Sequence, residues 1–184
     1  YLNINWNSGL ATTTGDIQHG ERFINGESGD QSQSGVIKEA GGFGGVAPTG
    51  GKRLEVFSVP MRATAAGELS LAGSPSANLP AHALLAYGTD SGIDASLAKF
   101  GQLHLTIAER LNADTPGDDG GDARQISDAP VDPIKQTVPS NAIVELELTV
   151  TAPDGTPLAN PRVGDEFVLH VWAKDLRSNP QGVF

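Results

Sequence analysis

Acidic residues crowd into one stretch of the chain, and their type and spacing come nearest to a chemical site. Asp114, Asp118, Asp119 and Asp122 lie close together among glycines and prolines. Carboxylate oxygens are ligands that calcium, a hard cation, prefers. The cluster therefore predicts a bound Ca²⁺ as cofactor, although no glutamate stands at the twelfth position of an EF-hand loop. The alternative is a solvated linker that is stiffened by its like charges.

Other reactive residue types lack the spacing of a catalytic site. No two histidines stand at i and i+4 with the glutamate of a metalloprotease motif, and no serine lies in a Gly-x-Ser-x-Gly elbow. The glycine-rich residues 41–53 do not form a phosphate loop, because Arg53 replaces the metal-binding hydroxyl. These patterns predict that the protein is not an enzyme. The histidines are His19, His82, His104 and His170.

Composition narrows the classes of partner. The chain has 184 residues, of which 38% are hydrophobic, enough for one large domain or two small ones with an ordinary core. A net charge of −10 repels phosphate backbones and anionic lipid surfaces, so nucleic acid is not expected as a partner. No apolar run reaches the length of a membrane span. The absence of cysteine leaves no disulfide or thiolate zinc site.

Alternation of apolar and polar residues predicts the elements that must position these side chains. Side chains of a strand point to opposite faces with a period of two, so such runs indicate strands with one buried face. The runs are residues 2–6, 103–107, 144–150 and 167–172. Residues 54–63 and 68–71 predict two further strands, paired through a connection at residues 65–67. The predicted class is all-β, since only residues 95–100 could form even a short helix.

Turn and loop residues indicate how the chain is divided. Pro153, Asp154 and Gly155 form a turn tripeptide. Residues 26–51, rich in Gly, Ser and Gln, predict a long loop. Residues 112–139 have the Asp, Gly and Pro content of a linker. We therefore expect a first β-sandwich part at residues 1–111, a linker at 112–139 and a second part at 140–184.

The two tryptophans have two interpretations. They could form a platform for carbohydrate, or they could fill the core. Trp6 shares its strand face with Leu2 and Ile4, which favours the core. Trp172 falls on the face opposite Phe167, Leu169 and Val171, so an exposed Trp172 would favour contact with a partner.

The end of the chain resembles a known kind of repeat. Residues 163–184, VGDEFVLHVWAKDLRSNPQGVF, are similar to the opening strands of cohesin-like repeats in giant surface proteins of planctomycete-type bacteria. In such repeats this opening precedes a strand similar to residues 1–10, YLNINWNSGL, and residues 54–67, 79–88 and 100–107 resemble the closing strands. The resemblance implies a cohesin-like, immunoglobulin-like jelly-roll β-sandwich that acts in assembly or adhesion, and fold likeness alone does not establish function.

This resemblance implies that residues 1–111 are the C-terminal part of one repeat and residues 140–184 the N-terminal strands of the next. Each part would be completed by strands from a neighbouring repeat or subunit, which gives a head-to-tail array of copies. We thus expect a structural subunit of an extracellular or cell-surface filament, stalk or surface layer. The alternative is a calcium-dependent adhesion or carbohydrate-binding module. The expected interface residues are Tyr1, Leu2, Ile4, Trp6, Phe167, Leu169, Val171, Trp172, Val183 and Phe184.

Overall fold

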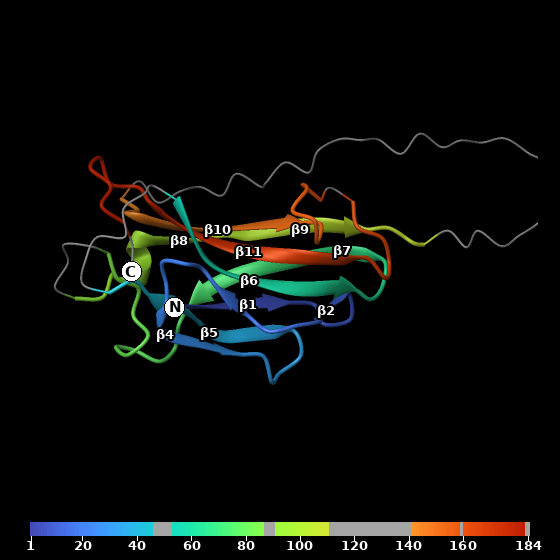
Figure 1. Ribbon diagram of the computed structural model, residues 1–184, viewed down its shortest axis with the longest axis horizontal. Coiled ribbons are helices and arrows are strands. Elements are labelled where there is room, and N and C mark those ends of the chain that lie inside the picture. Colours follow the sequence, from blue (N-terminus) through green and yellow to red (C-terminus); the bar gives the residue numbers. More distant parts are fainter. Residues whose placement is uncertain (46–52, 87–90, 111–140, 159, 183–184) are drawn as a thin grey trace, which may run out of the picture.

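The computed structural model describes residues 1–45, 53–86, 91–110, 141–158 and 160–182. Two β-sheets pack face to face in these residues, as Figure 1 shows. A single 3₁₀ turn, η1 (Ala95–Leu97), is the only helical element that they contain. The prediction of an all-β sandwich is confirmed.

The five-stranded sheet is built entirely from the first part of the chain. Its order is β4 (Asn25–Asp30), β5 (Val36–Phe43), β1 (Leu2–Trp6), β7 (Gly67–Pro75) and β9 (Gln102–Ile107), with every neighbouring pair antiparallel. The prediction of a loop over residues 26–51 is wrong for β4 and β5. β4 is a mostly exposed edge strand, so it needs no apolar alternation and its sequence does not reveal it.

The six-stranded sheet combines both parts of the chain. Its order is β2 (Ala11–Thr13), β6 (Arg53–Ala63), β11 (Glu166–Asp175), β10 (Val144–Thr151) and β8 (Ala98–Phe100), and β3 (Gln18–His19) also pairs with β6. β10 and β8 run parallel, whereas the other pairs are antiparallel. The strands predicted near the C-terminus thus lie inside a sheet.

Two connections differ from expectation. β6 and β7 lie in opposite sheets, so residues 65–67 cross between the sheets and do not join paired strands. Gly67 has a φ of +145°, a value that L side chains rarely adopt, and this lets the chain change sheets there. The helical prediction for residues 95–100 holds only for η1, because β8 occupies Ala98–Phe100 and pairs with β10. The turn at residues 153–155 is confirmed, and Gly155 donates its N–H to Ala152 O at 2.9 Å.

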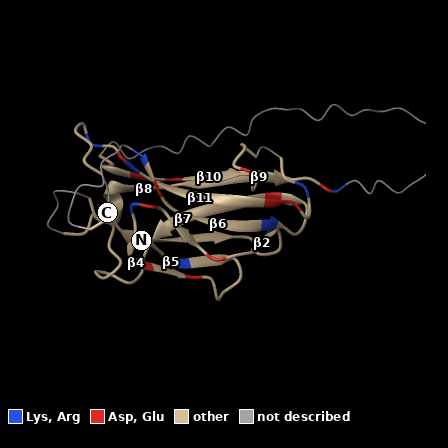
Figure 2. Ribbon diagram, viewed as in Figure 1, with Lys and Arg blue, Asp and Glu red and all other residues tan. Residues whose placement is uncertain are grey.

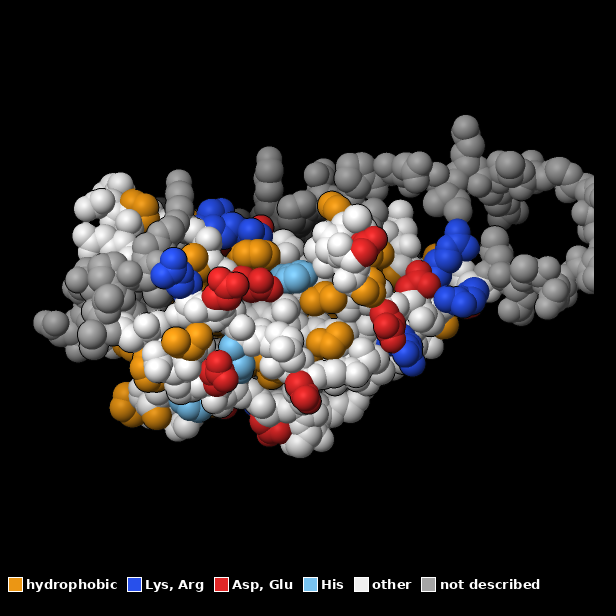
Figure 3. Space-filling model, in the orientation of Figure 1, with side chains coloured by type: hydrophobic (Ala, Val, Ile, Leu, Met, Phe, Trp, Pro, Cys, Tyr) orange, Lys and Arg blue, Asp and Glu red, His pale blue; other side chains and the backbone are white. Residues whose placement is uncertain are grey.

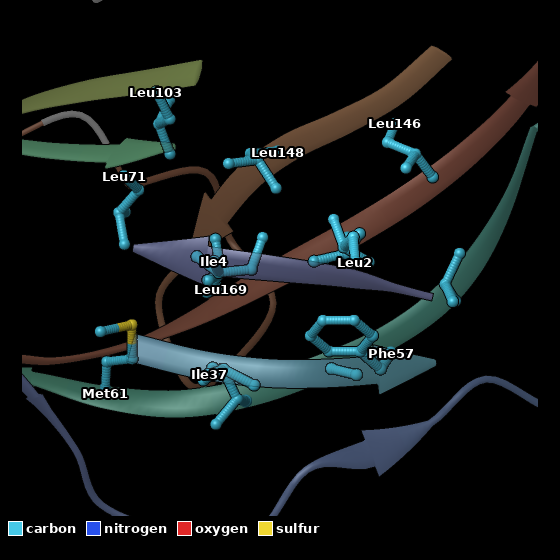
Figure 4. Packing of buried hydrophobic residues seen from close by; sticks show 14 of the residues in the cluster. Leu2, Ile4, Ile37, Phe57, Met61, Leu71, Leu103, Leu146, Leu148 and Leu169 are labelled. Atoms are coloured by element: carbon cyan, nitrogen blue, oxygen red, sulfur yellow. The ribbon is translucent and has the colours of Figure 1, made fainter. Parts of the chain in front are cut away.

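The core lies between the sheets and draws on every part of the described chain. Leu2 and Ile4 of β1 face Phe57 and Met61 of β6 and Leu169 of β11, as Figure 4 shows. All five are at most 1% exposed. Full burial of such side chains contributes about 1.5–3 kcal/mol each. Removing either part of the chain would therefore open the core.

Candidate functional site

The junction between two segments of the chain is the candidate functional site. We call residues 1–110 the N-terminal segment and residues 141–182 the C-terminal segment. β11 lies between β6 and β10, so the C-terminal segment occupies the interior of the six-stranded sheet. β11 pairs with β6 from Glu166↔Arg62 to Lys174↔Arg53. On the other flank, β10 pairs with β8. The two segments, expected to belong to successive repeats, thus form one sandwich here, and their assignment to separate repeats stays a prediction.

The inward side of the junction is fully apolar. Phe167, Leu169 and Val171 of β11 are 0% exposed. They stand in register with Met61, Val59 and Phe57 of β6, which are equally buried. These three predicted interface residues are therefore buried between the two segments.

The predicted interface residues near the N-terminus lie in the opposite sheet. Leu2 and Ile4 are buried in the same core as β11, while Trp6 is half-buried against it. The indole N–H of Trp6 donates to Ala11 O at 2.8 Å, which holds the ring at the core margin. Tyr1 lies at the end of the sandwich and donates its hydroxyl to Gly26 O at 2.6 Å. Val183 and Phe184 lie outside the described residues.

A β-bulge changes which side chains of β6 face outward. The register shifts between Val171 and Trp172 of β11, so Val56 is an extra residue in β6. Val56 and Phe57 are consecutive and both buried, and Glu55 consequently turns to the outer face. Simple alternation cannot predict this, because the bulge breaks the period of two.

Glu55 meets a histidine of β11 on that outer face. His170 Nδ1 lies 2.6 Å from Glu55 Oε1, and His170 Nε2 lies 3.0 Å from Thr151 Oγ1. Both ring nitrogens therefore have partners, and one of these partners comes from the N-terminal segment. His170 joins three strands of the sheet.

Trp172 is enclosed by its neighbours. The Arg53 guanidinium lies 3.8 Å from the centroid of its ring, and the His170 ring stacks beside it at 5.9 Å. The indole N–H donates to Thr149 Oγ1 at 2.8 Å. A sugar platform presents a free aromatic face, which this arrangement does not favour. The contacts instead join β6, β10 and β11.

Four ion pairs cross the junction in the described part of the chain, beside the His170–Glu55 contact. They are Arg53–Glu147 at 2.9 Å, Arg62–Glu166 at 2.5 Å, Lys99–Glu145 at 2.5 Å and Arg110–Asp165 at 3.1 Å. Figure 2 shows the basic end of β6 beside the acidic start of β11, and in Figure 3 acidic and basic side chains are interspersed on the viewed face. Burial raises the pKa of Glu145, but hydrogen bonds from Lys99 and Lys174 outweigh it and lower the pKa overall. The lowered pKa favours the ionised form of Glu145 at the junction.

A buried carboxylate fixes the end of the C-terminal segment. The Asp175 side chain is 0% exposed, and its oxygens accept hydrogen bonds from the Arg177 guanidinium at 2.7 and 2.9 Å. They also accept from the backbone N–H groups of Arg177, Gln181 and Gly182 at 2.9–3.0 Å. Burial raises the pKa of Asp175, but these donors outweigh it and bring the pKa to about 2. The loop after β11 is therefore folded around one anion.

A second carboxylate cluster lies at the end of the five-stranded sheet. Glu39 has a φ of +53°, uncommon outside glycine, and accepts hydrogen bonds from the Ser76 hydroxyl and the Ala77 N–H. His82 Nδ1 lies 2.8 Å from Glu39 Oε2 and its ring stacks on Tyr1 with centroids 4.3 Å apart. Burial raises the pKa of Glu39, but its donors bring it to about 2. Because the Ser76 hydroxyl donates to Glu39, the cluster differs from one in which a histidine activates a serine.

The predicted calcium ligands Asp114, Asp118, Asp119 and Asp122 fall outside the described residues. Within the described ranges, no three His, Asp or Glu side chains gather as a possible metal site. No helix in these ranges is long and apolar enough to cross a membrane. Comparison with known protein families, curated proteins and solved structures yields no match.

Sequence reasoning missed the residues that join the two segments across their outer face. The sequence around β6 does not reveal the roles of Arg53, Glu55 and Arg62, because their partner strand, β11, is remote in the sequence. One signal could have been used. Glu145 and Glu147 occupy successive outward positions of β10. Two carboxylates on one partly covered face of a sheet predict cations on the neighbouring strands.

Proposed function

We propose that the chain is a structural, non-enzymatic subunit of an extracellular or cell-surface filament, stalk or surface layer, in which copies share β-sandwiches head to tail. The single observation that carries this proposal is the place of the C-terminal segment. Its strands β10 and β11 fill the interior of a sheet whose other strands come from the N-terminal segment. A place of this kind can be filled by the same chain or by another copy.

The N-terminal segment needs a partner segment. Without β10 and β11, β6 would lose the neighbour with which it pairs along most of its length. Among the described residues, β8 would lose the one strand with which it pairs. Phe57, Val59 and Met61 would lose the apolar side chains that stand opposite them. An open edge above an exposed core is a site for strand addition. The N-terminal segment is therefore an acceptor for a strand pair.

The length of chain between the segments permits either source. Ala108 bonds to Pro161 and Val163 near the start of β11, whereas Ile143 bonds to Leu97 at the opposite end of β10. The two described ends of the connection are thus separated by about the length of β10, whose eight residues span about 26 Å. A chain of about 30 residues reaches at most ~100 Å. Residues 111–140 are therefore long enough to close on their own sandwich or to reach a neighbouring one.

Exchange between copies would give an open polymer. Each copy would donate its C-terminal segment to one neighbour and accept that of another, which is a heterologous contact. Such contacts generate fibres when the rotation between copies does not close a ring. This geometry supports a filament or stalk in preference to a compact enzyme.

Shortening the connection tests the proposal. Deleting residues 114–137 leaves too few residues to span about 26 Å, so a chain could no longer complete its own sandwich. We expect this variant to form folded oligomers or fibres at a concentration where the full chain is monomeric. Light scattering after size exclusion, circular dichroism and negative-stain electron microscopy measure this. A shortened chain that is folded and monomeric, or that never folds at any concentration, contradicts the proposal.

A further inference from the structure

We propose that the N-terminal segment selects its partner by charge, and that the partner is the acidic C-terminal segment of a second copy. This inference rests on the proposed function, because it names what the acceptor recognises. It is drawn from the sign of the charges on each side of the junction.

The ion pairs at the junction are arranged in one direction. In all four pairs, the cation belongs to the N-terminal segment and the anion to the C-terminal segment, while in the His170–Glu55 contact the carboxylate belongs to the N-terminal segment. The four cations are Arg53, Arg62, Lys99 and Arg110, and the four anions are Glu147, Glu166, Glu145 and Asp165. One face is therefore basic and the inserted strands are acidic.

This polarity opposes the overall charge of the chain. Residues 1–110 contain seven basic and ten acidic side chains, and residues 141–182 contain three basic and six acidic ones. Both segments are net negative, so two copies repel each other at long range. More than half of the basic residues in 1–110 nevertheless lie at the junction. Local complementarity of this kind steers association and suppresses wrong partners.

The pairs cover both flanks and both ends of the inserted strands. Arg53 and Arg62 stand at the two ends of β6, and Lys99 lies on β8. A slip of one residue would turn every outward side chain of β11 toward the core. The charges and the buried apolar side chains therefore specify the same register.

Exposure decides what these pairs contribute. The side chains of Arg62 and Glu166 are each 50% exposed, and those of Arg53 and Glu147 are 39% and 36% exposed. Pairs this open add little to stability, and salt screens them. Reversing one partner replaces attraction by repulsion, so the pairs act on partner choice more than on folding.

Charge reversal on separate chains tests the inference. One chain carries Arg53→Glu and Arg62→Glu, a second carries Glu147→Arg and Glu166→Arg, and a control chain carries all four changes. All have the shortened connection, which prevents closure within a chain. Matched charges then occur only between unlike chains in a mixture of the first two. Because the protein has no cysteine, Ser34→Cys on an exposed loop provides a single dye position for energy transfer.

We expect the mixture to associate about tenfold more tightly than either reversed chain alone, and the control chain to associate like the parent. The preference should largely disappear in about 1 M salt, where the screening length is about 3 Å. Equal association of matched and mismatched chains overturns the charge inference while leaving shared sandwiches intact.

Failure of the proposed function can be distinguished from failure of the charge inference. If no shortened chain associates, the proposed function fails. A second copy is then excluded as the partner, and charge selection of the chain's own C-terminal segment is judged on full-length chains by thermal unfolding. A lower melting temperature of both reversed chains, restored in the four-fold control, shows that the junction still recognises its segment by charge. Equal melting temperatures overturn it.

Discussion

The two sheets of the sandwich differ in where their strands come from. The five-stranded sheet contains β4, β5, β1, β7 and β9, and all of them precede residue 110. The six-stranded sheet takes its two central partners, β10 and β11, from beyond residue 140. One sheet is therefore complete within the N-terminal segment, and the other depends on a segment that must be delivered to it. Changes at the second should affect both stability and association.

The edges of the sheets support the same contrast. β4 ends the five-stranded sheet with the residues NGESGD, which are mostly exposed and include two acids. Polar, charged edges discourage the addition of further strands. The interior position of β11 is apolar on one face and charge-paired on the other. Strand exchange is thus favoured at one place and opposed at another.

Truncation of the core should separate the two regions most strongly. Phe167→Ala removes a fully buried ring between β11 and β6 and should cost about 3–5 kcal/mol of unfolding free energy. Phe43→Ala, on β5 of the five-stranded sheet, removes a ring that is 39% exposed and should cost about 1 kcal/mol or less. Urea denaturation measures both. Equal losses would show that the buried contact between β11 and β6 contributes no more than an exposed ring of the other sheet.

Removal of the buried charge at the end of β11 should rank next. Asp175→Asn leaves the Arg177 guanidinium without its carboxylate partner and should cost about 3 kcal/mol. Asp154→Asn, at an exposed turn where Asp154 accepts a hydrogen bond from the Thr156 N–H, is the matched control and should cost about 1 kcal/mol or less. Chemical denaturation at pH 7 compares them. A neutral Asp175→Asn would show that the loop after β11 does not need this anion.

Acid should weaken the same end of the molecule. The pKa of Asp175 is about 2 in the folded protein and 3.8 in its ordinary state. Because the folded pKa is the lower one, its contribution of about 2 kcal/mol is complete above pH 4 and is lost as the pH falls toward 2. Glu39 loses its own contribution in the range from 4.5 to about 2. Denaturation from pH 5 to pH 2 should therefore show a shallower decline for Asp175→Asn, and an unchanged slope would contradict this assignment.

The smallest effect concerns the outer face. Arg53→Met removes an ion pair and the cation over the Trp172 ring, and should cost about 1 kcal/mol at low salt. Arg62→Met removes only a half-exposed ion pair and should cost less than about 0.5 kcal/mol. Thermal unfolding at low and high ionic strength separates them. A larger loss for Arg62→Met would mean that the Trp172 contact contributes nothing.

Local patterns predicted most strands but not their neighbours. Alternation identified β1, β9, β10 and β11, because each has one apolar face, and residues 54–63 and 68–71 also predicted β6 and β7. It missed β4, whose side chains face solvent, and it could not place the bulge at Val56, which depends on the register with β11. The ion pairs and the Glu39 cluster join residues far apart in the sequence, so no local signal defines them. Pairing across the chain had to come from the structure.

The connection of about 30 residues has a consequence for the balance between self-closure and exchange between copies. A tether of this length holds a chain's own strand pair at an effective concentration on the order of millimolar. In dilute solution each copy should therefore complete its own sandwich and remain monomeric. If copies exchange strands as proposed, neighbours would outcompete self-closure only above that concentration. The length of the connection would then set the protein concentration at which exchange between copies begins.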